Sequence, residues 1–550
     1  MGKKVVIVGG VAGGASAAAR LRRLDEDMEI IIFERGEHIS YANCGLPYYV
    51  SGVINQRDAL LVQTPEGMKK RFNIDVRTFS EVTRILPAEK IVEVQEAYGK
   101  TYRETYDQLI LSPGAAPLRP PIPGIDDIEA LVVRNVTDID RIKQYIDEKQ
   151  PRSAAVVGGG FIGLEMAENL QHKGVATTLI EMSNQVMAPL DYEMAAILHE
   201  HIFNKNVDLI LEDGVKSFTQ EGDKTLITLQ SGNQVETELT ILAIGVKPEI
   251  KLAKEAGLAI GELGGIKVNE KLQTSDPNIF AVGDAIEVKH FVTGKPALIP
   301  LAGPANKQGR IVADIIAGRD SKYEGTQGTS IAKVFDMAAA STGANEKMLK
   351  RYGIPYEAIF THSGSNAAYY PGATRLSTKL LFDKSNDRVL GAQIVGMNGV
   401  DKRIDDIAGV IRRQGTVYDL QELELAYAPP FSSAKDPVNM AGYVAENVIN
   451  GDVRMVHWYE VKDMNPNDVY IIDVRTIEER RGKFIPGSIH IPIDELRDHL
   501  SELPKDKDIV VYCEIGLRGY VAYRILTQHG FTRVRDLTGG WVTYFPPVFG

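Results

Sequence analysis

The chain has 550 residues, of which 44% are hydrophobic and 25% are charged, and this composition is ordinary for a globular protein. The length exceeds what one hydrophobic core supports, so we expect three or four domains. The 62 basic and 73 acidic residues give a net charge of −11. Because nucleic acids and membrane surfaces attract proteins with a positive field, we predict no nucleic-acid partner and no membrane partner.

Only two cysteines occur in the chain, Cys44 and Cys513. Two cysteines cannot form a disulfide framework, and their scarcity is typical of a reducing compartment. The N-terminal sequence MGKKVVIVGG leads straight into a strand-like run without an apolar signal core, and no apolar run approaches the length that spans a bilayer. We therefore predict a cytoplasmic protein. No metal site is predicted from the sequence.

Residues 4–34 are typical of a dinucleotide-binding βαβ unit. The β-branched run KVVIV predicts a buried parallel strand, the turn GGVAGG follows it, and ASAAARLRRL favours a helix. A second apolar run ends at Glu34, about twenty residues after the last glycine, where a carboxylate can reach a ribose. Val11 stands where the middle glycine normally lets the backbone approach a pyrophosphate, so this first turn departs from the usual pattern.

Cys44 lies in the segment SYANCGLPYY, shortly after the first βαβ unit. The residues GLPYYVSG favour a short helix, and a thiol at a helix N-terminus has its thiolate stabilised by the positive end of the helix dipole. No second cysteine is nearby, so Cys44 must act alone, alternating between a thiolate and a mixed disulfide, persulfide or sulfenic acid. The alternative interpretation is a buried, inert cysteine.

The dinucleotide-binding pattern recurs at residues 154–181. The run AAVV leads into GGGFIG, in which Gly158, Gly160 and Gly163 form the complete G-x-G-x-x-G, and a helix-favouring stretch and the strand-like TTLIE then end at Glu181. A single motif of this kind is also compatible with a tight turn that binds nothing. The internal repeat makes two nucleotide sites the better interpretation. No arginine immediately follows Glu181, which favours NADH over NADPH.

Three further segments connect the two units: LILSPGAAP (109–117), ILAIGVKP (241–248) and TSDPNIFAVGD (274–284). With the two glycine turns, they resemble the flavoprotein reductases that have two dinucleotide-binding domains, and the resemblance covers roughly residues 1–450. It implies an α/β protein with two Rossmann-like domains and an α+β dimerisation domain. The implied ranges are 1–115 with 246–325 for FAD, 116–245 for NAD(P)H and 326–450 for dimerisation.

The segment SYANCGLPYY, together with GGVAGG, closely resembles the coenzyme A-disulfide reductases. That resemblance implies that Cys44 forms a mixed disulfide with coenzyme A beside the flavin. It also implies a homodimer in which two tyrosines of the partner subunit face the cysteine. Tyr369 and Tyr427 match these tyrosines best, with Tyr370 as an alternative to Tyr369 and interface packing as the other interpretation. NADH peroxidases and water-forming NADH oxidases carry a histidine where this chain has Ala12, which argues against peroxide or oxygen chemistry.

The cofactors implied by these resemblances are FAD, NADH or NADPH, and coenzyme A. Asp284 is expected on the ribityl chain of FAD, and the coenzyme A contacts are expected at Ser40, Asn43 and Arg23. The basic group Lys69–Arg71 is a second candidate for the phosphates of coenzyme A, and a solvated helix face is the alternative. The positions carried over for binding are Gly9, Gly10, Ala12, Gly13, Gly14, Ser16, Arg20, Arg23, Glu34, Arg35, Ser40, Asn43, Arg71, Ser112, Gly114, Gly158, Gly160, Phe161, Ile162, Gly163, Glu181, Gly245, Asp284 and Ala302.

Cys513 follows the strand-like VVY and opens a six-residue loop, Cys513–Arg518, before a helix-favouring stretch. Loop amides can converge as an anion-binding nest, and Arg518 adds a positive charge, so we expect a lowered thiol pKa and a stabilised persulfide anion. The loop resembles the active-site loop of rhodaneses, as do IDVRTIEERRGKFIPGSIHIP and LTGGW. A rhodanese-like α/β domain at 455–550 is implied, in which Asp473 and Arg475 hold the fold together rather than do chemistry.

Taken together, the chain resembles a coenzyme A-disulfide reductase fused to a rhodanese domain. The implied activity passes electrons from NAD(P)H through FAD to Cys44. It reduces coenzyme A disulfide, persulfides or polysulfides, with release of hydrogen sulfide, while Cys513 carries sulfane sulfur. The alternatives are an NADH oxidase or peroxidase and a redox-sensing sulfur carrier. The sequence leaves open which sulfur substrate is physiological and how sulfur passes between the two cysteines.

Overall fold

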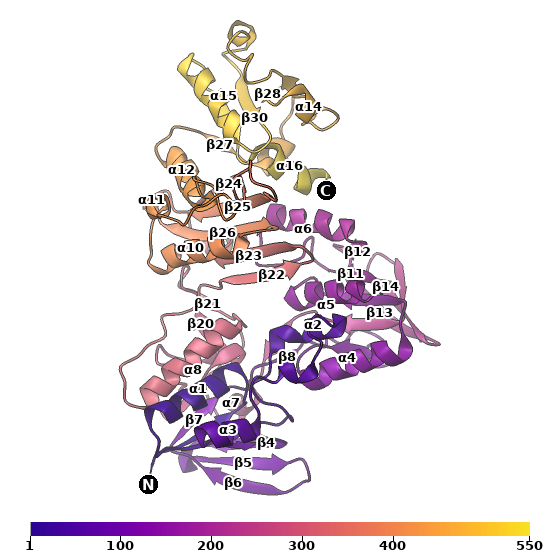
Figure 1. The fold of residues 1–550 in the computed structure, drawn as a ribbon, viewed down its shortest axis with the longest axis vertical. Helices are drawn as coiled ribbons and strands as arrows, with labels where there is room; N and C mark the ends of the chain where they lie inside the picture. Colours follow the sequence, from indigo (N-terminus) through magenta and orange to yellow (C-terminus); the bar gives the residue numbers. More distant parts are fainter. Residues whose placement is uncertain (1, 550) are drawn as a thin grey trace. The chain divides into compact units, whose positions relative to one another are not determined.

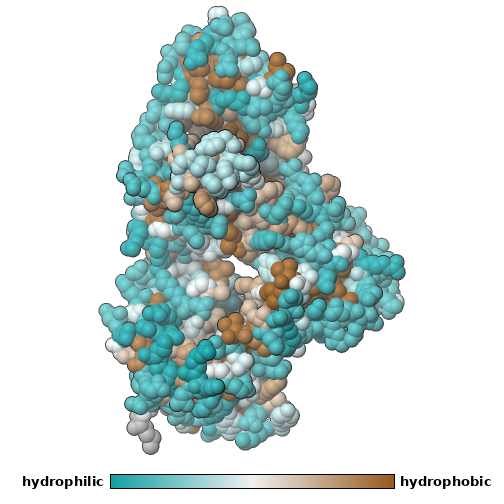
Figure 2. Space-filling model, in the orientation of Figure 1, coloured by the Kyte–Doolittle hydropathy of each residue, from teal (hydrophilic) through white to brown (hydrophobic). Residues whose placement is uncertain are grey.

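The computed structural model describes residues 2–549. The chain divides into two compact units, one formed by Met1–Ser183 and Asn206–Gly328 and the other by Asn184–Lys205 and Thr329–Gly550. Figure 1 shows the elements of both units, coloured along the sequence. None of the helices within residues 2–549 is both long and apolar enough to cross a membrane. On the face drawn in Figure 2, hydrophobic residues form small separate patches among hydrophilic ones.

The first βαβ pattern forms the centre of a parallel sheet in the first unit. Its apolar strands are buried because the sheet is covered on both faces, as parallel sheets usually are. The strands, in spatial order, are β19 (Ile279–Ala281), β7 (Gln108–Leu111), β1 (Lys4–Val8), β2 (Glu29–Phe33) and β3 (Asp75–Arg77). Helix α1 (Ala12–Leu24) packs closely on α8 (Ala302–Ile316), where a Cβ atom on Gly309 would lie 2.2 Å from the Gly13 carbonyl oxygen.

The second βαβ pattern forms a second parallel sheet in the same unit. Its order is β12 (Val207–Ile210), β11 (Ala176–Ile180), β10 (Ser153–Val157), β16 (Leu239–Leu242) and β9 (Ala130–Val132), and its helices include α5 (Phe161–His172) and α4 (Val136–Lys149). In each sheet the strand before the glycine turn lies between the strand that ends in the acid and a later strand of the chain. The predicted internal repeat is therefore a structural repeat.

Smaller elements complete the first unit. Two three-stranded sheets are antiparallel: β4 (Ser80–Leu86), β5 (Ile91–Glu96) and β6 (Thr101–Thr105), and β13 (Val215–Glu221), β14 (Lys224–Leu229) and β15 (Gln234–Thr237). The remaining strands are β8 (Ala115–Pro117), β17 (Val246–Pro248), β18 (Ile266–Lys267), β20 (Ile286–Lys289) and β21 (Pro296–Ala297). The remaining helices are α2 (Leu46–Ser51), α3 (Pro65–Phe72) and α7 (Lys251–Glu255), with short 3₁₀ turns at η1 (Asn43–Gly45), η2 (Arg57–Leu60), η3 (Pro87–Glu89) and η4 (Gly283–Ala285).

The second unit begins with an antiparallel sheet. Its strands, in spatial order, are β22 (Ser330–Val334), β23 (Met337–Gly343), β26 (Val389–Gly396), β25 (Arg375–Phe382) and β24 (Glu357–Gly364). The accompanying helices are α6 (Tyr192–Asn204), α9 (Glu346–Tyr352), α10 (Val400–Arg412), α11 (Val417–Glu422) and α12 (Pro437–Ile449). Helix α6 groups with this unit, although the sequence-based boundaries include it in the NAD(P)H-binding domain. The exact domain boundaries stay a prediction.

The C-terminal part of the second unit holds a parallel sheet. Its order is β27 (Met455–Val456), β31 (Val534–Leu537), β30 (Asp508–Tyr512), β28 (Val469–Asp473) and β29 (Ile489–His490). Its helices are α13 (Trp458–Lys462), α14 (Ile477–Arg480), α15 (Leu517–Gln528) and α16 (Gly540–Phe549), with a 3₁₀ turn η5 (Leu500–Glu502). The predicted fold class, with two Rossmann-like domains, an α+β region and a C-terminal α/β domain, is confirmed.

The C-terminal sheet is attached to the antiparallel sheet by specific polar contacts. The Phe360 amide of β24 donates to Thr538 Oγ1 at 3.0 Å. His362 Nε2 lies 2.8 Å from Thr543 Oγ1, and burial lowers the pKa of His362 to about 3, so the ring is neutral. The Trp458 indole donates to Glu193 Oε2 of α6 at 3.4 Å. Because both partners in each contact belong to the second unit, these bonds fix the C-terminal sheet on its neighbour.

A buried charge cluster lies in the same unit. Lys379 of β25 is fully buried and its Nζ lies 2.8 Å from Asp191, 2.5 Å from Glu193 and 2.9 Å from Glu346. The three carboxylates are close enough together to hold a metal ion, but the ammonium group lies among them. Although burial favours the neutral amine, the carboxylates raise the pKa of Lys379 above its ordinary value. The ammonium is therefore the counter-ion that joins α6, α9 and β25.

Replacing Lys379 with methionine should destabilise the second unit strongly, because three buried carboxylates lose their counter-ion. The expected loss in the free energy of unfolding is about 3–5 kcal/mol. Denaturant unfolding followed by tryptophan fluorescence measures this unit, since Trp458 and Trp541 are the only two tryptophans in the chain. The exposed Lys384, 3.9 Å from Glu357, is the matched control, and Lys384→Met should cost less than about 1 kcal/mol. Equal effects of the two substitutions would contradict the role of the cluster.

Candidate active sites

Both glycine turns bring a strand end and a helix start into a contact that leaves no room for side chains. In the first turn Gly9 has a φ of +95°, and a Cβ atom on Gly14 would lie 2.0 Å from the Gly9 carbonyl oxygen. In the second turn Gly158 has a φ of +110°, and a Cβ atom on Gly163 would lie 1.8 Å from the Gly158 carbonyl oxygen. Gly9, Gly14, Gly158 and Gly163 are thus required by backbone conformation or by close approach.

The acid at the end of each second strand binds the adjacent glycine turn. Glu34 accepts hydrogen bonds from the amides of Gly10 at 3.0 Å and Gly36 at 2.9 Å. Glu181 accepts from the amides of Gly159 at 2.7 Å and Ser183 at 2.8 Å. Each carboxylate is therefore held at the carboxyl edge of its sheet, next to the turn, which is where the sequence pattern predicted a ribose contact.

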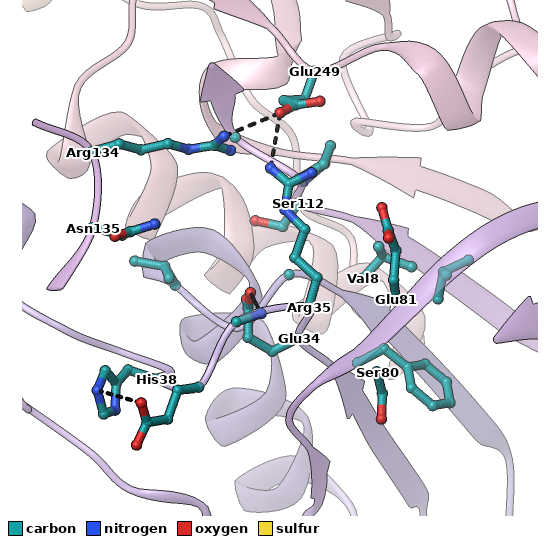
Figure 3. A pocket seen from close by; sticks show the side chains of 18 of the residues that line it. Val8, Glu34, Arg35, His38, Ser80, Glu81, Ser112, Arg134, Asn135 and Glu249 are labelled. Atoms are coloured by element: carbon teal, nitrogen blue, oxygen red, sulfur yellow. Dashed lines mark hydrogen bonds and ion pairs between the residues drawn. The ribbon is translucent and has the colours of Figure 1, made fainter. Parts of the chain in front are cut away.

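A cavity of about 490 Å³ opens at the carboxyl edge of the first sheet. Figure 3 shows side chains that line it, including Glu34, Arg35 and Ser112. Of the predicted cofactor residues, the lining includes Gly9, Glu34, Arg35, Asn43, Ser112, Gly114 and Asp284. Val11 also lines it, so the residue that replaces the middle glycine faces the cavity without closing it.

Two charged residues of the cavity were missed by the sequence analysis. Glu249 binds Arg35 at 2.9 Å and Arg134 at 3.2 Å, as Figure 3 shows. The pair with Glu249 holds Arg35 at the cavity wall and raises its pKa against the opposing effect of burial. Glu249 follows the predicted crossover ILAIGVKP by one position, but no motif marks it, so only the three-dimensional structure shows its role.

The second turn leaves space beside its middle glycine. A Cβ atom on Gly160 would meet nothing within 4 Å, and the residue has no positive φ, so neither packing nor backbone conformation requires glycine there. Phe161 and Ile162 begin helix α5 directly after it. The protein itself leaves space for a side chain at position 160. A pyrophosphate that approaches the turn closely explains why the residue is nevertheless glycine.

Other predicted binding residues lie at the helix surfaces of the first unit. Arg20 of α1 forms an ion pair with Asp314 of α8 at 2.8 Å, so its guanidinium is already engaged within the chain. Ser16 hydroxyl lies 2.6 Å from Asn306 Oδ1. Arg23 and Arg71 are exposed and form no ion pair among the described residues. The remaining predicted positions, Gly10, Ala12, Gly13, Gly14, Ser40, Gly245 and Ala302, lie in the turns and helix starts of this unit.

Cys44 lies in the 3₁₀ turn η1, immediately before the predicted helix α2, and it is exposed. The expectation of a stabilised thiolate is wrong for this structure. Partial desolvation by the surrounding protein raises the pKa of Cys44, and the carboxylates of Glu165 and Asp284 raise it further. These effects outweigh the dipole of α2, which has only six residues. The influence of Asp284 also places the thiol near the predicted flavin contact.

Glu165 and Tyr48 form a polar pair near Cys44 that sequence reasoning missed. The Tyr48 hydroxyl donates to Glu165 Oε1 at 3.4 Å, from α2 to α5. Burial raises the pKa of Glu165 to about 7, with a smaller contribution from Glu168. Glu165 follows the G-x-G-x-x-G by two positions, but nothing in that spacing indicates that it faces a cysteine 121 positions earlier in the chain.

The two predicted tyrosines lie together in the second unit. Tyr369 and Tyr427 are 58 positions apart in sequence, yet their hydroxyl oxygens are 3.0 Å apart. Both side chains are exposed, Tyr369 by 77% and Tyr427 by 46%. The hydrogen bond to Tyr369 raises the pKa of Tyr427. Tyr369, rather than Tyr370, is the partner of Tyr427, which favours the register that the sequence analysis preferred.

Cys513 lies at the bottom of the predicted loop nest and is fully buried. The Gly516 amide donates to Cys513 Sγ at 3.2 Å, and Gly516 has a φ of +104°. The expectation of a lowered pKa is wrong here. Burial raises the pKa of the Cys513 thiol, the carboxyl of Asp536 adds to the increase, and the loop amides only partly oppose it. Arg518 interacts with Cys513 as well as with Glu479, which it pairs at 2.6 Å, but the pKa of the thiol stays raised.

Asp473 and Arg475 form the structural network that was predicted for them. Both are fully buried, and Arg475 Nη2 lies 2.9 Å from Asp473 Oδ2. The Tyr512 hydroxyl donates to the same carboxylate at 2.7 Å, and the Arg475 guanidinium lies 4.9 Å from the centre of the Trp541 ring. This network supports the loop that begins after Tyr512, so its role is to hold the loop in place.

The sequence matches three family models. Residues 3–309 match the pyridine nucleotide-disulphide oxidoreductase model, residues 329–437 match the dimerisation domain of the same family, and residues 457–545 match the rhodanese-like domain. The chain belongs to the pyridine nucleotide-disulphide oxidoreductase family.

Individual proteins of known name are also similar to this oxidoreductase in sequence and structure. The coenzyme A disulfide reductase of Staphylococcus haemolyticus is 37% identical over 448 residues, which are 81% of this chain and 100% of that protein. The reduced CoADR-RHD of Bacillus anthracis is 56% identical, with a TM-score of 0.97 over 100% of this chain and 98% of its own. The NAD-dependent persulfide reductase from A. fulgidus is 40% identical, with a TM-score of 0.93 over 98% of this chain and 100% of its own.

The oxidoreductase depends on FAD and NAD(H), like its family. The residues present fit both groups, because the cavity at the first sheet is large and the second turn is open beside Gly160. We predict that Glu34, Ser112 and Asp284 hold FAD and that Gly160 and Glu181 hold the nicotinamide nucleotide.

Replacing Gly160 with alanine should weaken nucleotide binding without weakening the fold. The added methyl group meets no protein atom within 4 Å, so the thermal midpoint should stay unchanged, whereas it occupies the space that the pyrophosphate needs. We expect the KM for NADH to rise about tenfold or more, measured by steady-state kinetics, with FAD content as the control. Gly158→Ala is the contrasting variant, and it should lower the thermal midpoint, since its Cβ atom would lie 2.4 Å from a carbonyl oxygen. An unchanged KM in Gly160→Ala would contradict this site.

Replacing Glu165 with glutamine should lower the pKa of Cys44, because a carboxylate that opposes the thiolate is removed. In a Cys513→Ser background, the midpoint of the iodoacetamide alkylation rate against pH should move down by about half a pH unit or more. The exposed Glu66 on α3 is the matched control, and Glu66→Gln should leave the profile unmoved. A profile that is the same in all three proteins would show that Glu165 does not act on the thiol.

Proposed function

We propose that this oxidoreductase is an NAD(P)H-dependent reductase of coenzyme A disulfide, persulfides or polysulfides. The observation that carries the proposal is a single exposed thiol, Cys44, which is influenced by Asp284 at the predicted flavin site and has no second cysteine near it in the sequence. The relatives that share this chain's length and fold are a CoADR-RHD and a persulfide reductase, and both likenesses extend over the rhodanese region. When bound, FAD supplies two-electron transfer between the nicotinamide and sulfur.

The protein's own residues would carry out the sulfur chemistry. The Cys44 thiolate attacks one sulfur of a substrate R–S–S–R′, so that a bond forms between Cys44 Sγ and that sulfur while the S–S bond of the substrate breaks. The leaving sulfur departs as a thiolate and takes up a proton. We assign proton exchange near Cys44 at neutral pH to Glu165, whose pKa is about 7, together with its hydrogen-bond partner Tyr48. Exposure of Cys44 lets a large substrate reach it.

We further propose that two copies of the chain form a homodimer and that each completes the other's site. The match of residues 329–437 to a dimerisation domain supports the homodimer. Tyr369 and Tyr427 expose two hydrogen-bonded hydroxyl groups on the surface of the chain, where a partner subunit can reach them. A pair of hydrogen-bonded phenols can give a proton to the sulfur that leaves Cys44 of the partner subunit. Arg23, Arg71 and Asn43 are the proposed contacts for the phosphates of coenzyme A.

The nucleotide that the second turn prefers is NADH in this proposal. Both carboxylate oxygens of Glu181 accept hydrogen bonds from the chain, which fixes the charge beside the turn. A fixed carboxylate binds a ribose hydroxyl pair and repels the additional phosphate of NADPH. A comparison of kcat/KM for the two nucleotides measures the preference, and an equal or higher value for NADPH would contradict it.

Cys513 is proposed to carry sulfane sulfur. The loop amides of Ile515, Gly516 and Gly519 oppose the effect of burial on the thiol and are available to a larger, more polarisable persulfide anion. Two free cysteines and no disulfide are present in residues 2–549, and this supports the proposed location in the reducing cytoplasm.

The proposal is tested by NADH oxidation with three substrates, namely coenzyme A disulfide, coenzyme A persulfide and a polysulfide. Cys44→Ser should abolish turnover of all three, since Cys44 is the one cysteine of the unit that holds the predicted flavin site. Cys513→Ser should leave coenzyme A disulfide turnover within about twofold and slow only substrates that need sulfur transfer. Oxygen consumption that matches NADH oxidation, without turnover of these substrates, would instead establish an oxidase. A stable Cys513 persulfide without turnover would establish a sulfur carrier.

A further inference from the structure

A second cavity, of about 410 Å³, lies within the second unit. The rhodanese domain forms one wall through residues that include Arg475 and Trp541, and the antiparallel sheet with helix α6 forms the other. The two walls meet where α16 packs on α6 (Figure 1). A volume of this size is typical of a small-molecule site, and none of the predicted cofactor-binding residues lines it.

The cavity lies at the carboxyl edge of the parallel sheet of the rhodanese domain. Arg475 and Glu479 follow β28, whereas Glu514 follows β30, directly after Cys513, and Trp541 follows β31. The chain leaves β28 toward β29 on one side of the sheet and leaves β30 toward β31 on the other. Ligands of open α/β sheets bind outside the carboxyl ends of the strands, at such a reversal of strand order. The cavity is therefore located where this fold class binds small molecules.

The charges at the cavity are not balanced by the chain itself. Ion pairs within the chain use four of the ionisable residues that line it: Arg475 with Glu514, Glu479 with Arg518, and His201 with Asp336. Three other lining residues, Glu200, Arg375 and Lys483, form no ion pair among residues 2–549. Each of the three comes from a different part of the chain, namely α6, β25 and the segment after α14. Two positive charges and one negative charge thus remain for a ligand.

The rest of the wall suits an organic molecule better than an inorganic ion. Trp541 and Phe545 line the cavity from α16, and Ile197 and Met337 line it from the opposite wall. Apolar and aromatic side chains with a few polar groups are usual for sites of small organic ligands. Lys483 Nζ lies 5.8 Å from the centre of the Phe545 ring, so one unpaired cation stands beside the aromatic part of the wall.

We propose that this cavity binds a small organic zwitterion with two carboxylates and one ammonium group, such as a short acidic peptide. Arg375 and Lys483 bind the carboxylates and Glu200 binds the ammonium, so the charges of ligand and cavity cancel. Arg375 and Glu200 lie outside the rhodanese domain, and the antiparallel sheet and α6 thereby take part in a ligand site of that domain. The inference does not depend on the proposed function of either cysteine.

The test titrates S-methylglutathione into the full-length, FAD-loaded protein. This probe has two carboxylates and one ammonium group, and its blocked sulfur cannot react with a thiol. Calorimetry gives the Kd, and tryptophan fluorescence should change because Trp541 lines the cavity. Arg375→Gln and Lys483→Gln should each raise the Kd about tenfold or more, since each removes a charge-assisted bond to a carboxylate. Both side chains are exposed and unpaired, so the thermal midpoint should stay unchanged.

The ammonium contact is tested with Glu200→Gln and with N-acetyl-S-methylglutathione, which keeps both carboxylates but lacks the positive charge. Glu200→Gln should raise the Kd for S-methylglutathione about tenfold. The acetylated compound should bind Glu200→Gln and the unsubstituted protein equally. An equal loss of affinity for the two compounds would overturn the proposed role of Glu200.

The exposed Arg497 of the rhodanese domain, which does not line the cavity, is the matched control. Arg497→Gln should leave the Kd unchanged. Absence of binding by the unsubstituted protein, or a Kd that Arg375→Gln and Lys483→Gln do not alter, would overturn the inference. Neither readout involves turnover of a sulfur substrate, so failure of this site and failure of the proposed function are distinguishable.

Discussion

The first unit depends on one steric constraint, the absence of side chains where a strand end meets a helix start. At Gly14 and at Gly163 an added Cβ atom would overlap the carbonyl oxygen of Gly9 or Gly158, so each helix can begin only because these positions are glycine. This contact sets the direction of α1 and α5 and leaves turn amides free to bind Glu34 and Glu181. The carboxyl edge of each sheet thereby becomes polar and concave, and the cavity beside the first sheet follows from the same geometry.

Much of this arrangement was predictable, because the features that determine it are local in sequence. Short apolar runs followed by glycine-rich turns specified both parallel sheets, and the positions of Glu34 and Glu181 followed from strand length. The hydrogen bond between Tyr369 and Tyr427 is different, since it joins residues 58 positions apart. Only the resemblance to a known family brought those two residues together in advance.

The pKa values of the two thiols could not be predicted from the sequence, because burial and distant carboxylates determine them. The helix start at Cys44 and the amide nest at Cys513 are both present, yet the pKa of each thiol is raised. A local pattern shows which groups favour a thiolate, but it does not show how much water the fold removes or which distant carboxylates approach. Arg20 illustrates the same limit, because its partner Asp314 lies 294 positions further along the chain. A cation that looks available in sequence is thus engaged in the folded protein.

The segment LTGGW (Leu537–Trp541) makes two contacts that connect the rhodanese domain to the rest of the second unit. On one side, Thr538 Oγ1 accepts from the Phe360 amide of the neighbouring sheet. On the other side, the Trp541 amide donates to the Cys513 carbonyl at 2.8 Å. The same five residues therefore join the sulfur-carrying loop to the antiparallel sheet. A rhodanese domain transplanted from another protein at the chain junction near residue 450 would lose the contact of Thr538 unless it carried a threonine there, and its attachment would then depend on the contacts of Thr543 and Trp458.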